Sequence, residues 1–181
     1  MRNKLYKYII VSSIIIIPIL FSCATTQQKA ATYNSRGIIY VEKGQYDQAI
    51  SEFNKAIAID PKFAWAYSNR SFAYTCRSQY DEAISDSNKA VEIDPKMAAF
   101  YHNRGIAYLG KEQFDQVISD FSKAIEINPR YGEAYYNRGR SHYLKKEYDK
   151  SWEDIKRAED LGHKIPANFL EELRKASGRE K

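Results

Sequence analysis

Histidine and cysteine are the residues of this chain that could serve as bases, nucleophiles or metal ligands, and they are few and scattered. His102, His142 and His163 stand 40 and 21 residues apart, without the short spacing of paired metal ligands. The sequence also contains no histidine–glutamate zinc motif, no glycine-rich phosphate loop and no serine nucleophile elbow. We therefore predict no enzyme activity, no catalytic residue, no metal, no cofactor and no small-molecule substrate. An unrecognised enzyme remains an alternative.

Arginine offers a second kind of chemistry, because four arginines recur at intervals of 34 residues and a carboxylate follows each one sixteen residues later. The arginines are Arg36, Arg70, Arg104 and Arg138, and the carboxylates are Glu52, Asp86, Asp120 and Asp154. This pattern allows a row of phosphate-binding sites or a ladder of structural ion pairs. Since each arginine has its own carboxylate, and a partly buried arginine needs one, we favour ion pairs.

The arginines belong to a longer pattern that is written four times along the chain. Other residue types recur with the same spacing: Tyr33, Tyr67, Tyr101 and Tyr135; Asp47, Asp81, Asp115 and Asp149; and, in three copies, Pro61, Pro95 and Pro129. A period of this length predicts a stacked array, in which each unit buries its apolar face against its neighbours.

Each unit is expected to form two helices. In the third copy the apolar series Ala98–Tyr108 and Phe114–Ile125 both advance in steps of three and four residues, which marks one face of a helix. Glycines inside the first helix, at Gly37, Gly105 and Gly139, predict a close approach of the partner helix. The recurring aspartates should cap the second helix at its start, and the prolines should end it.

The repeated unit resembles the tetratricopeptide repeat. The first copy carries that family's pattern in full, with Tyr33, Gly37, Tyr40, Ala49, Phe53, Ala56 and Pro61. The resemblance implies an all-α fold, a right-handed superhelical α-solenoid. It would contain four units, over residues 31–63, 64–97, 98–131 and 132–165. Residues 166–181 follow as a capping helix and tail, with Phe169, Leu170 and Leu173 on one side.

The same resemblance implies a concave groove, lined by the first helices, that binds an extended peptide or a protein partner. The candidate groove residues are Asn34, Ile38, Trp65, Asn69, Phe72, His102, Asn103, Ile106, Tyr136, Asn137 and Arg140. The asparagines Asn69, Asn103 and Asn137 could pair with a peptide backbone, or form a solvated polar stripe. Trp65 and Phe72, seven residues apart, could anchor a partner or complete the packing between units.

One subfamily of these repeats clamps a C-terminal carboxylate with lysine, asparagine and arginine side chains. The corresponding residues of this chain are Asn34, Ile38, Asn69, Ala99 and Asn103, so only Asn69 agrees. The sequence therefore disfavours this type of clamp.

The first 22 residues resemble a bacterial lipoprotein signal peptide. Arg2, Lys4 and Lys7 precede an apolar run that ends at Leu20-Phe21-Ser22-Cys23. The resemblance implies a lipid on Cys23, a short tether over residues 23–30, and a place in the bacterial cell envelope, on the periplasmic side of the outer membrane where there are two membranes. An uncleaved membrane anchor is the alternative, although the apolar run falls short of the roughly 20 residues that span a bilayer. An acylated Cys23 would leave Cys76 as the remaining thiol, either a tolerated small residue or an intermolecular partner.

The net charge of +5 comes largely from this leader, which holds three basic and no acidic residues. Without it, 25 basic residues face 23 acidic ones, so we predict no nucleic-acid partner. The sequence thus predicts a membrane-anchored adaptor that binds proteins in its groove and contributes to envelope assembly. The alternative is a structural subunit that assembles through its convex face or capping helix.

Overall fold

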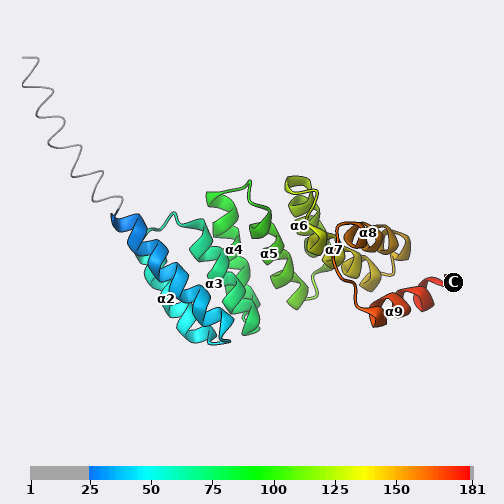
Figure 1. Ribbon diagram of the computed structural model, residues 1–181, viewed down its shortest axis with the longest axis horizontal. Coiled ribbons are helices and arrows are strands. Elements are labelled where there is room, and N and C mark those ends of the chain that lie inside the picture. Colours follow the sequence, from blue (N-terminus) through cyan, green and yellow to red (C-terminus); the bar gives the residue numbers. More distant parts are fainter. Residues whose placement is uncertain (1–24, 180–181) are drawn as a thin grey trace, which may run out of the picture.

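The computed structural model describes residues 25–179, and this part of the chain is built from helices and turns without a strand (Figure 1). Residues 25–42 are helical, and the following helices are α2 (Tyr46–Ile59), α3 (Ala64–Cys76), α4 (Tyr80–Ile93), α5 (Ala98–Gly110), α6 (Phe114–Ile127), α7 (Gly132–Leu144), α8 (Tyr148–Asp160) and α9 (Ala167–Ser177). The helices form successive antiparallel pairs along a solenoid, which confirms the predicted fold class. None of the described helices has the length and apolar character that crossing a membrane requires.

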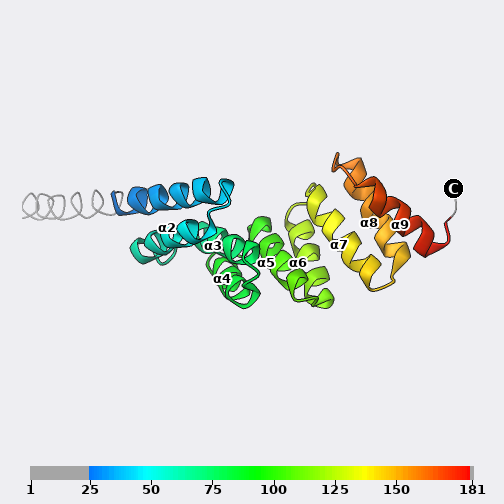
Figure 2. The same cartoon turned by 90° about the horizontal axis from the view of Figure 1, so that it is seen from below.

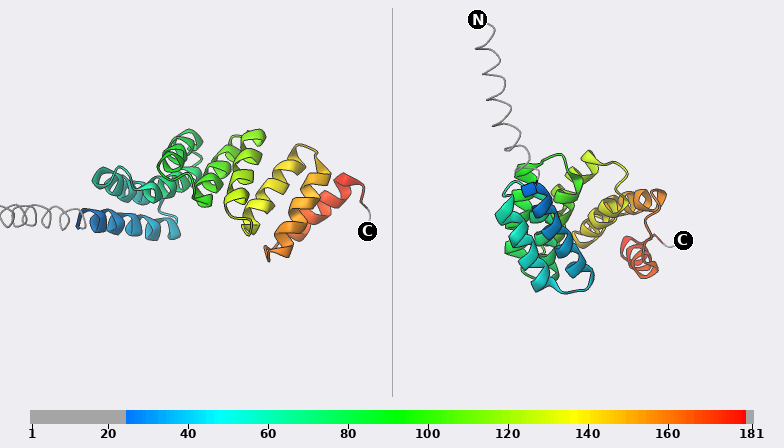
Figure 3. Two further views of the ribbon diagram at one scale, coloured as in Figure 1. Left: turned by 90° about the horizontal axis from the view of Figure 1, so that it is seen from above. Right: turned by 60° about the vertical axis from the view of Figure 1, so that its left-hand side comes forward.

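The first helix of each pair, called here an inner helix, packs against its own partner and against the pair before it. The inner helices are residues 25–42, α3, α5 and α7, and the outer helices are α2, α4, α6 and α8. The inner helices α3 and α5 pack on each other, whereas the outer helix α4 lies against α3 and α5. Neighbouring units follow one another along the array in both views of Figure 3, and the inner helices are those that the tetratricopeptide resemblance expects on the hollow side.

A missing side chain allows the two helices of a unit to approach closely, as the glycine pattern predicts. A Cβ atom added to Gly105 would stand 3.0 Å from Cε1 of Phe121, which is fully buried on the outer helix. Gly37 meets Phe53 in the same way in the first unit. The glycines therefore compensate their low helix propensity by admitting a large aromatic side chain.

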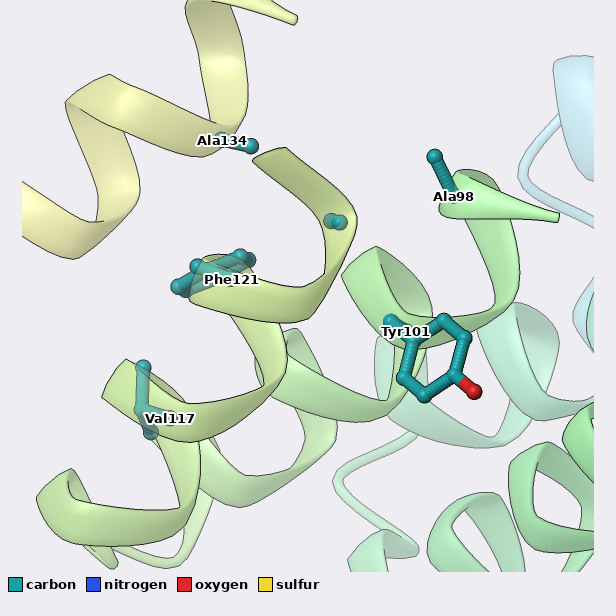
Figure 4. Packing of buried hydrophobic residues seen from close by; sticks show 6 residues of the cluster. Ala98, Tyr101, Val117, Phe121 and Ala134 are labelled. Carbon is teal, nitrogen blue, oxygen red and sulfur yellow. The ribbon is translucent and has the colours of Figure 1, made fainter. Parts of the chain in front are cut away.

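The apolar core continues from one unit into the next. Tyr101, Val117 and Phe121 from the third unit form one cluster that reaches Ala134 on α7 of the fourth (Figure 4). Because no unit encloses its own core, each pair of helices depends on its neighbours for burial.

The helix ends agree with the predicted stops, and the helix starts agree in position but not in the predicted capping hydrogen bond. Helices α2, α4 and α6 end directly before Asp60, Asp94 and Asn128, each followed by proline. At the start of the outer helices, Asp47 and its equivalents lie in the first turn as predicted, where their charge favours the positive end of the helix dipole. No side-chain capping hydrogen bond forms there, so that part of the prediction is wrong.

The aspartates instead form salt bridges with the next unit, in a series that we call the edge ladder. Its four rungs join Arg77 to Asp47, Lys111 to Asp81, Lys145 to Asp115 and Arg179 to Asp149. Three of the cations follow the first helix of a unit, and Arg179 follows α9; each carboxylate comes from the preceding outer helix. The partners lie 30 residues apart in every rung, so these ion pairs tie neighbouring units together.

The C-terminal helix α9 packs against α8 and acts as a cap (Figure 2). Phe169 and Leu173 are buried with Ile155 of α8, and Trp152 donates a hydrogen bond from Nε1 to Ser177 Oγ at 3.0 Å. Arg179 adds the last rung of the edge ladder, with its Nη2 atom 2.7 Å from Asp149 Oδ1. Helix α9 therefore covers the apolar end of the fourth unit.

At the other end, the expected tether differs from the structure. The interval 23–30 is helical from residue 25 onward and is continuous with the first inner helix. Ala30 is buried, because it contributes to the packing of the first unit. Cys23 and the leader over residues 1–22 lie outside the described residues.

Candidate functional site

The predicted asparagine column lies on the inner helices but is used to join them. Asn69 donates from Nδ2 to Asn34 Oδ1 at 2.9 Å, and Asn103 donates from Nδ2 to Ser68 Oγ at the same distance. Asn137 Nδ2 lies 3.3 Å from His102 Nε2. Each asparagine thus contacts the preceding inner helix through its amide nitrogen, a role that neither prediction included.

Three apolar side chains remain open on the inner face, and we call them the apolar patch: Ile38, Trp65 and Phe72. Their exposed fractions are 38%, 42% and 41%. Ile38 and Phe72 occupy the same position in the first and second units, so they lie on neighbouring helices. The Trp65 ring meets the buried Phe100 edge-on, with centroids 5.0 Å apart. Trp65 therefore both completes the packing between units and presents a surface to solvent.

His102 is buried and fills the junction between the third and fourth units. Its ring stacks on Tyr131 with centroids 5.0 Å apart, and it tilts against Phe121 at 5.4 Å. Burial lowers the pKa of His102, although Glu133 Oε1 lies 3.7 Å from Nε2 and opposes that effect. The neutral ring can accept the hydrogen bond from Asn137 through Nε2. Burial also raises the pKa of Tyr131 to about 12, so both rings are uncharged near neutral pH.

The fourth unit gives the inner face a different character. Tyr136 is half-buried, with its ring 4.9 Å from His163 and 6.0 Å from Phe169 of the cap. Arg140 is exposed, and its guanidinium lies 5.7 Å from the centre of the Tyr136 ring. This end of the inner face therefore offers a cation beside an aromatic ring.

The eleven predicted groove residues differ in accessibility. Ile38, Trp65, Phe72 and Arg140 are exposed; Asn69, Asn103, Ile106 and Tyr136 are half-buried; and Asn34, His102 and Asn137 are buried. The exposed set combines an apolar region on the first two units with one cation on the fourth. Sequence reasoning missed Leu144, which is also exposed and ends the inner helix α7. Its signal was a leucine at a position where the earlier units have Glu42, Cys76 and Gly110.

The predicted arginine ladder forms in three units as bidentate ion pairs. Arg104 binds Asp120 through Nε at 2.8 Å and through Nη2 at 2.6 Å, and Arg70 with Asp86 and Arg138 with Asp154 repeat this geometry. Hydrogen bonding to Asp120 and to Asp154 raises the pKa of Arg104 and Arg138. Each aspartate is buried, and each guanidinium is mostly covered, so these pairs are structural.

Each ladder arginine also reaches the unit before it. The Nη1 atom of Arg104 donates to Asn88 Oδ1 at 2.8 Å, and that of Arg138 donates to Ser122 Oγ at 2.9 Å. Arg70 makes the same contact with Asn54. The partner lies sixteen residues before the arginine, so one guanidinium fastens two outer helices.

The first rung of the predicted ladder is wrong. In the described part of the chain no ion pair joins Arg36 to Glu52; Glu52 pairs instead with Lys55, and its Oε2 atom is buried without a hydrogen-bond partner. Glutamate is one methylene longer than the aspartate of the other units. The later arginines donate from Nη1 to the preceding outer helix, but no outer helix precedes Arg36 in the described residues. Arg36 lies over the Tyr33 ring, 5.6 Å from its centre.

No group of three or more potential metal ligands occurs within residues 25–179. His142 is buried beside the last ladder rung, with Nδ1 2.8 Å from Glu147 Oε2 and Nε2 3.9 Å from Asp154 Oδ2. These contacts bridge the two helices of the fourth unit. The free Cys76 is exposed at the end of α3.

Solved structures with similar folds are all-helical repeat proteins. The crystal structure of TTC0263, a thermophilic TPR protein of Thermus thermophilus, is 22% identical and superposes with a TM-score of 0.70 over 83% of this chain and 84% of its own. The crystal structure of MamA is 24% identical, with a TM-score of 0.69 over 74% and 78% of the two chains.

A third similar structure contains a bound peptide. It is the first TPR of Spaghetti (RPAP3) bound to the HSP90 peptide SRMEEVD, which is 27% identical, with a TM-score of 0.63 over 65% of this chain and 94% of its own. No curated protein sequence matches this chain.

The family models match the repeated region directly. One, described as TPR repeat, matches residues 37–76 and 72–112, and another, described as tetratricopeptide repeat, matches residues 98–131. Together these matches cover more than half of the chain, and they include the apolar patch and two of the three rungs of the arginine ladder. The chain belongs to the tetratricopeptide repeat family.

Proposed function

We propose that this chain is a membrane-anchored adaptor that binds a protein or peptide partner on its inner face. The apolar patch carries the proposal. Ile38, Trp65 and Phe72 are more than one-third exposed on two adjacent helices, whereas Phe53, Phe100 and Phe121 of the same array are fully buried. Large apolar groups that gather on a surface are typical of interaction sites, and aromatic side chains dominate the binding energy there.

The inner face favours a partner with apolar anchor residues. The related RPAP3 domain binds an HSP90 peptide, which supports peptide binding by this chain as well. That peptide, SRMEEVD, is acidic, but this chain has Asn34, Ala99 and Asn103 where a carboxylate clamp needs cations. Aliphatic or aromatic side chains of the partner would lie on the apolar patch. An acidic residue further along would reach Arg140, the one exposed cation among the predicted groove residues.

A protein partner also agrees better with this surface than nucleic acid. Binding of a phosphate backbone requires a row of exposed cations. The ladder arginines, which form the most regular row of cations, are already paired with Asp86, Asp120 and Asp154. The exposed inner face therefore offers apolar contacts in place of phosphate sites.

Membrane anchoring rests on the first 23 residues, which lie outside the described part of the chain. The basic start, the apolar run and Cys23 support acylation of that cysteine and a place in the cell envelope. Replacing Cys23→Ser should give a precursor that retains its leader and takes up no labelled fatty acid. Wild-type protein without lipid label would contradict the anchoring proposal and leave binding by the inner face intact.

The binding proposal is tested by crosslinked capture of partners from intact cells. Trp65→Ala combined with Phe72→Ala should reduce capture at least tenfold, because truncating two aromatic anchors removes roughly 2 kcal/mol each. Ser85→Ala is the control, since Ser85 is exposed on the outer helix α4 of the same unit. Capture that survives the double change, with the fold retained, would favour assembly through the outer face or the cap.

A further inference from the structure

The N-terminal end of the solenoid exposes one complete face of the first helix, and we call it the end face. Lys29, Thr32, Arg36, Ile39 and Lys43 follow one another in steps of three or four residues, and all five are exposed. This spacing places them on a single side of the helix. In the first view the helix stands at one end of the array, with α9 at the opposite end (Figure 1).

The same face is covered in every later unit. The residues that correspond to Ile39 are Ala73, Ala107 and Ser141, and those that correspond to Thr32 are Ala66, Phe100 and Ala134; all six are fully buried. They are buried because the preceding unit packs on them. Ile39 occupies a position that the preceding unit buries elsewhere in the array, but its side chain is 48% exposed because no described unit precedes it.

Two cations of the end face, Lys43 and Arg36, have equivalents that are paired in the later units. The equivalents of Lys43 form the four rungs of the edge ladder, and the equivalents of Arg36 form the three bidentate pairs. For Lys29, Arg36 and Lys43 themselves, no ion pair is formed with any residue of the described chain. The face therefore presents three cations around one isoleucine.

A second copy of the chain fits this face poorly. Head-to-tail stacking would require a free carboxylate at the far end of the solenoid, but Asp149 already binds Arg179. Helix α9 also occupies the place where the next unit would pack, since Phe169 and Leu173 are buried there. Ile39 is moreover larger than the alanines and serine that allow close stacking between units.

We propose that the end face binds the anionic headgroups of a phospholipid surface, so that the first helix lies against the membrane. The proposal rests on the anchoring through Cys23 described above, which leaves only five residues between Cys23 and Lys29. Cations near an anionic membrane each strengthen binding, by roughly fivefold. An apolar residue among them inserts toward the acyl boundary, as in amphipathic surface helices. In this orientation the inner face remains free for its partner.

The test is a lysine footprint on the complete, acylated chain. The protein is reconstituted into vesicles of phosphatidylcholine alone, or with about 30% phosphatidylglycerol to supply anionic headgroups. Lysines are acetylated briefly, and the rate at each site is read by mass spectrometry. Lys62 and Lys96 are matched controls, because both are exposed lysines in the turns between units.

We expect Lys29 and Lys43 to react at least threefold more slowly in the anionic vesicles, with Lys62 and Lys96 unchanged. High salt should remove the protection, since it screens exposed charges. Arg36→Glu should also remove it; this change breaks no ion pair of the described chain. Equal rates at Lys29 and Lys43 in the two vesicle types would overturn the proposal, as would equal slowing of the controls.

The same preparation separates the two proposals. Protein that floats with the vesicles while Lys29 and Lys43 stay unprotected would overturn the end-face contact and preserve the anchoring. Protein that does not associate with the vesicles at all would overturn both.

Discussion

The arginine ladder can be tested by removing one carboxylate in the middle of the array. In Asp120→Ala, Arg104 loses the acceptors at 2.8 Å and 2.6 Å and retains only Asn88 at 2.8 Å. Breaking a buried ion pair costs about 3–5 kcal/mol, because the remaining charge stays desolvated. The side chain of Arg104 is 20% exposed, so solvent reduces this cost, and we expect a loss of roughly 2–3 kcal/mol in the free energy of unfolding.

The first unit supplies the matched control for this prediction. Glu52 occupies the position of Asp120 but pairs only with Lys55, a half-exposed partner, and its Oε2 atom lacks a hydrogen bond. Glu52→Ala should therefore cost no more than about 1 kcal/mol, since exposed ion pairs contribute little. Both free energies come from urea denaturation followed by circular dichroism, with equal slopes required for the comparison.

A third variant identifies the cause of the loss. Replacing Asp120→Leu together with Arg104→Met removes both charges, so it should be less destabilising than Asp120→Ala alone. Two results would contradict this reasoning: a loss in Asp120→Ala no larger than that in Glu52→Ala, or a double variant of Asp120 and Arg104 that is the least stable of the three. Either would show that an unpaired buried charge is not the cause of the destabilisation.

Three further predictions concern packing and pH. Gly105→Ala should cost about 1–3 kcal/mol in urea denaturation, because the new Cβ would stand 3.0 Å from Phe121; an unchanged midpoint would show that the ring moves freely. Leu173→Ala should cost about 2–5 kcal/mol and expose the loop before α9 to proteases, because this fully buried side chain holds the cap; a cap that stays protected would contradict this role. Burial lowers the pKa of His102 in the folded chain, so the unfolded chain takes up a proton first and stability should fall as the pH drops below about 6.5. His102→Gln should reduce this fall between pH 7 and 5, and an unaltered pH profile would assign it to other groups.

The fold was readable from the sequence because one spacing recurs in several residue types. A stripe of apolar residues predicts which face of each helix is buried. An internal glycine opposite a phenylalanine predicts the close approach of the two helices, and a proline predicts where the second helix ends. Because the pattern recurs four times, it also predicts four successive pairs of helices along the chain. The pairing of arginine with a carboxylate sixteen residues later was also readable, since both partners lie within one unit.

Contacts between units were harder to predict, because their partners belong to different units of the array. Nothing in the sequence alone indicates that Lys111 turns back to Asp81 or that Asn103 turns back to Ser68. Both distances depend on how closely neighbouring units stack. For this reason the aspartates were assigned to helix caps, and the asparagines to a ligand or to solvent.

Two predictions failed at positions where one unit differs from the others in sequence or in its neighbours. Glu52 differs from the aspartates of later units by one methylene, and this visible difference accompanies the missing first rung. His102 was expected in the groove, but Tyr131 stacks on it and closes the junction. In the earlier units Phe63 and Met97 stand where Tyr131 stands, so the period gave no reason to expect a buried histidine there.

The most direct test of partner binding on the inner face is photocrosslinking in intact cells from single positions of the full chain. A photoreactive amino acid replaces Phe72 on the inner face in one strain, and Ser85 on the outer helix of the same unit in another; both residues are exposed. We predict a discrete crosslinked protein from position 72 that is absent from position 85. Crosslinks from position 85 alone, or of equal strength from both, would contradict binding by the inner face.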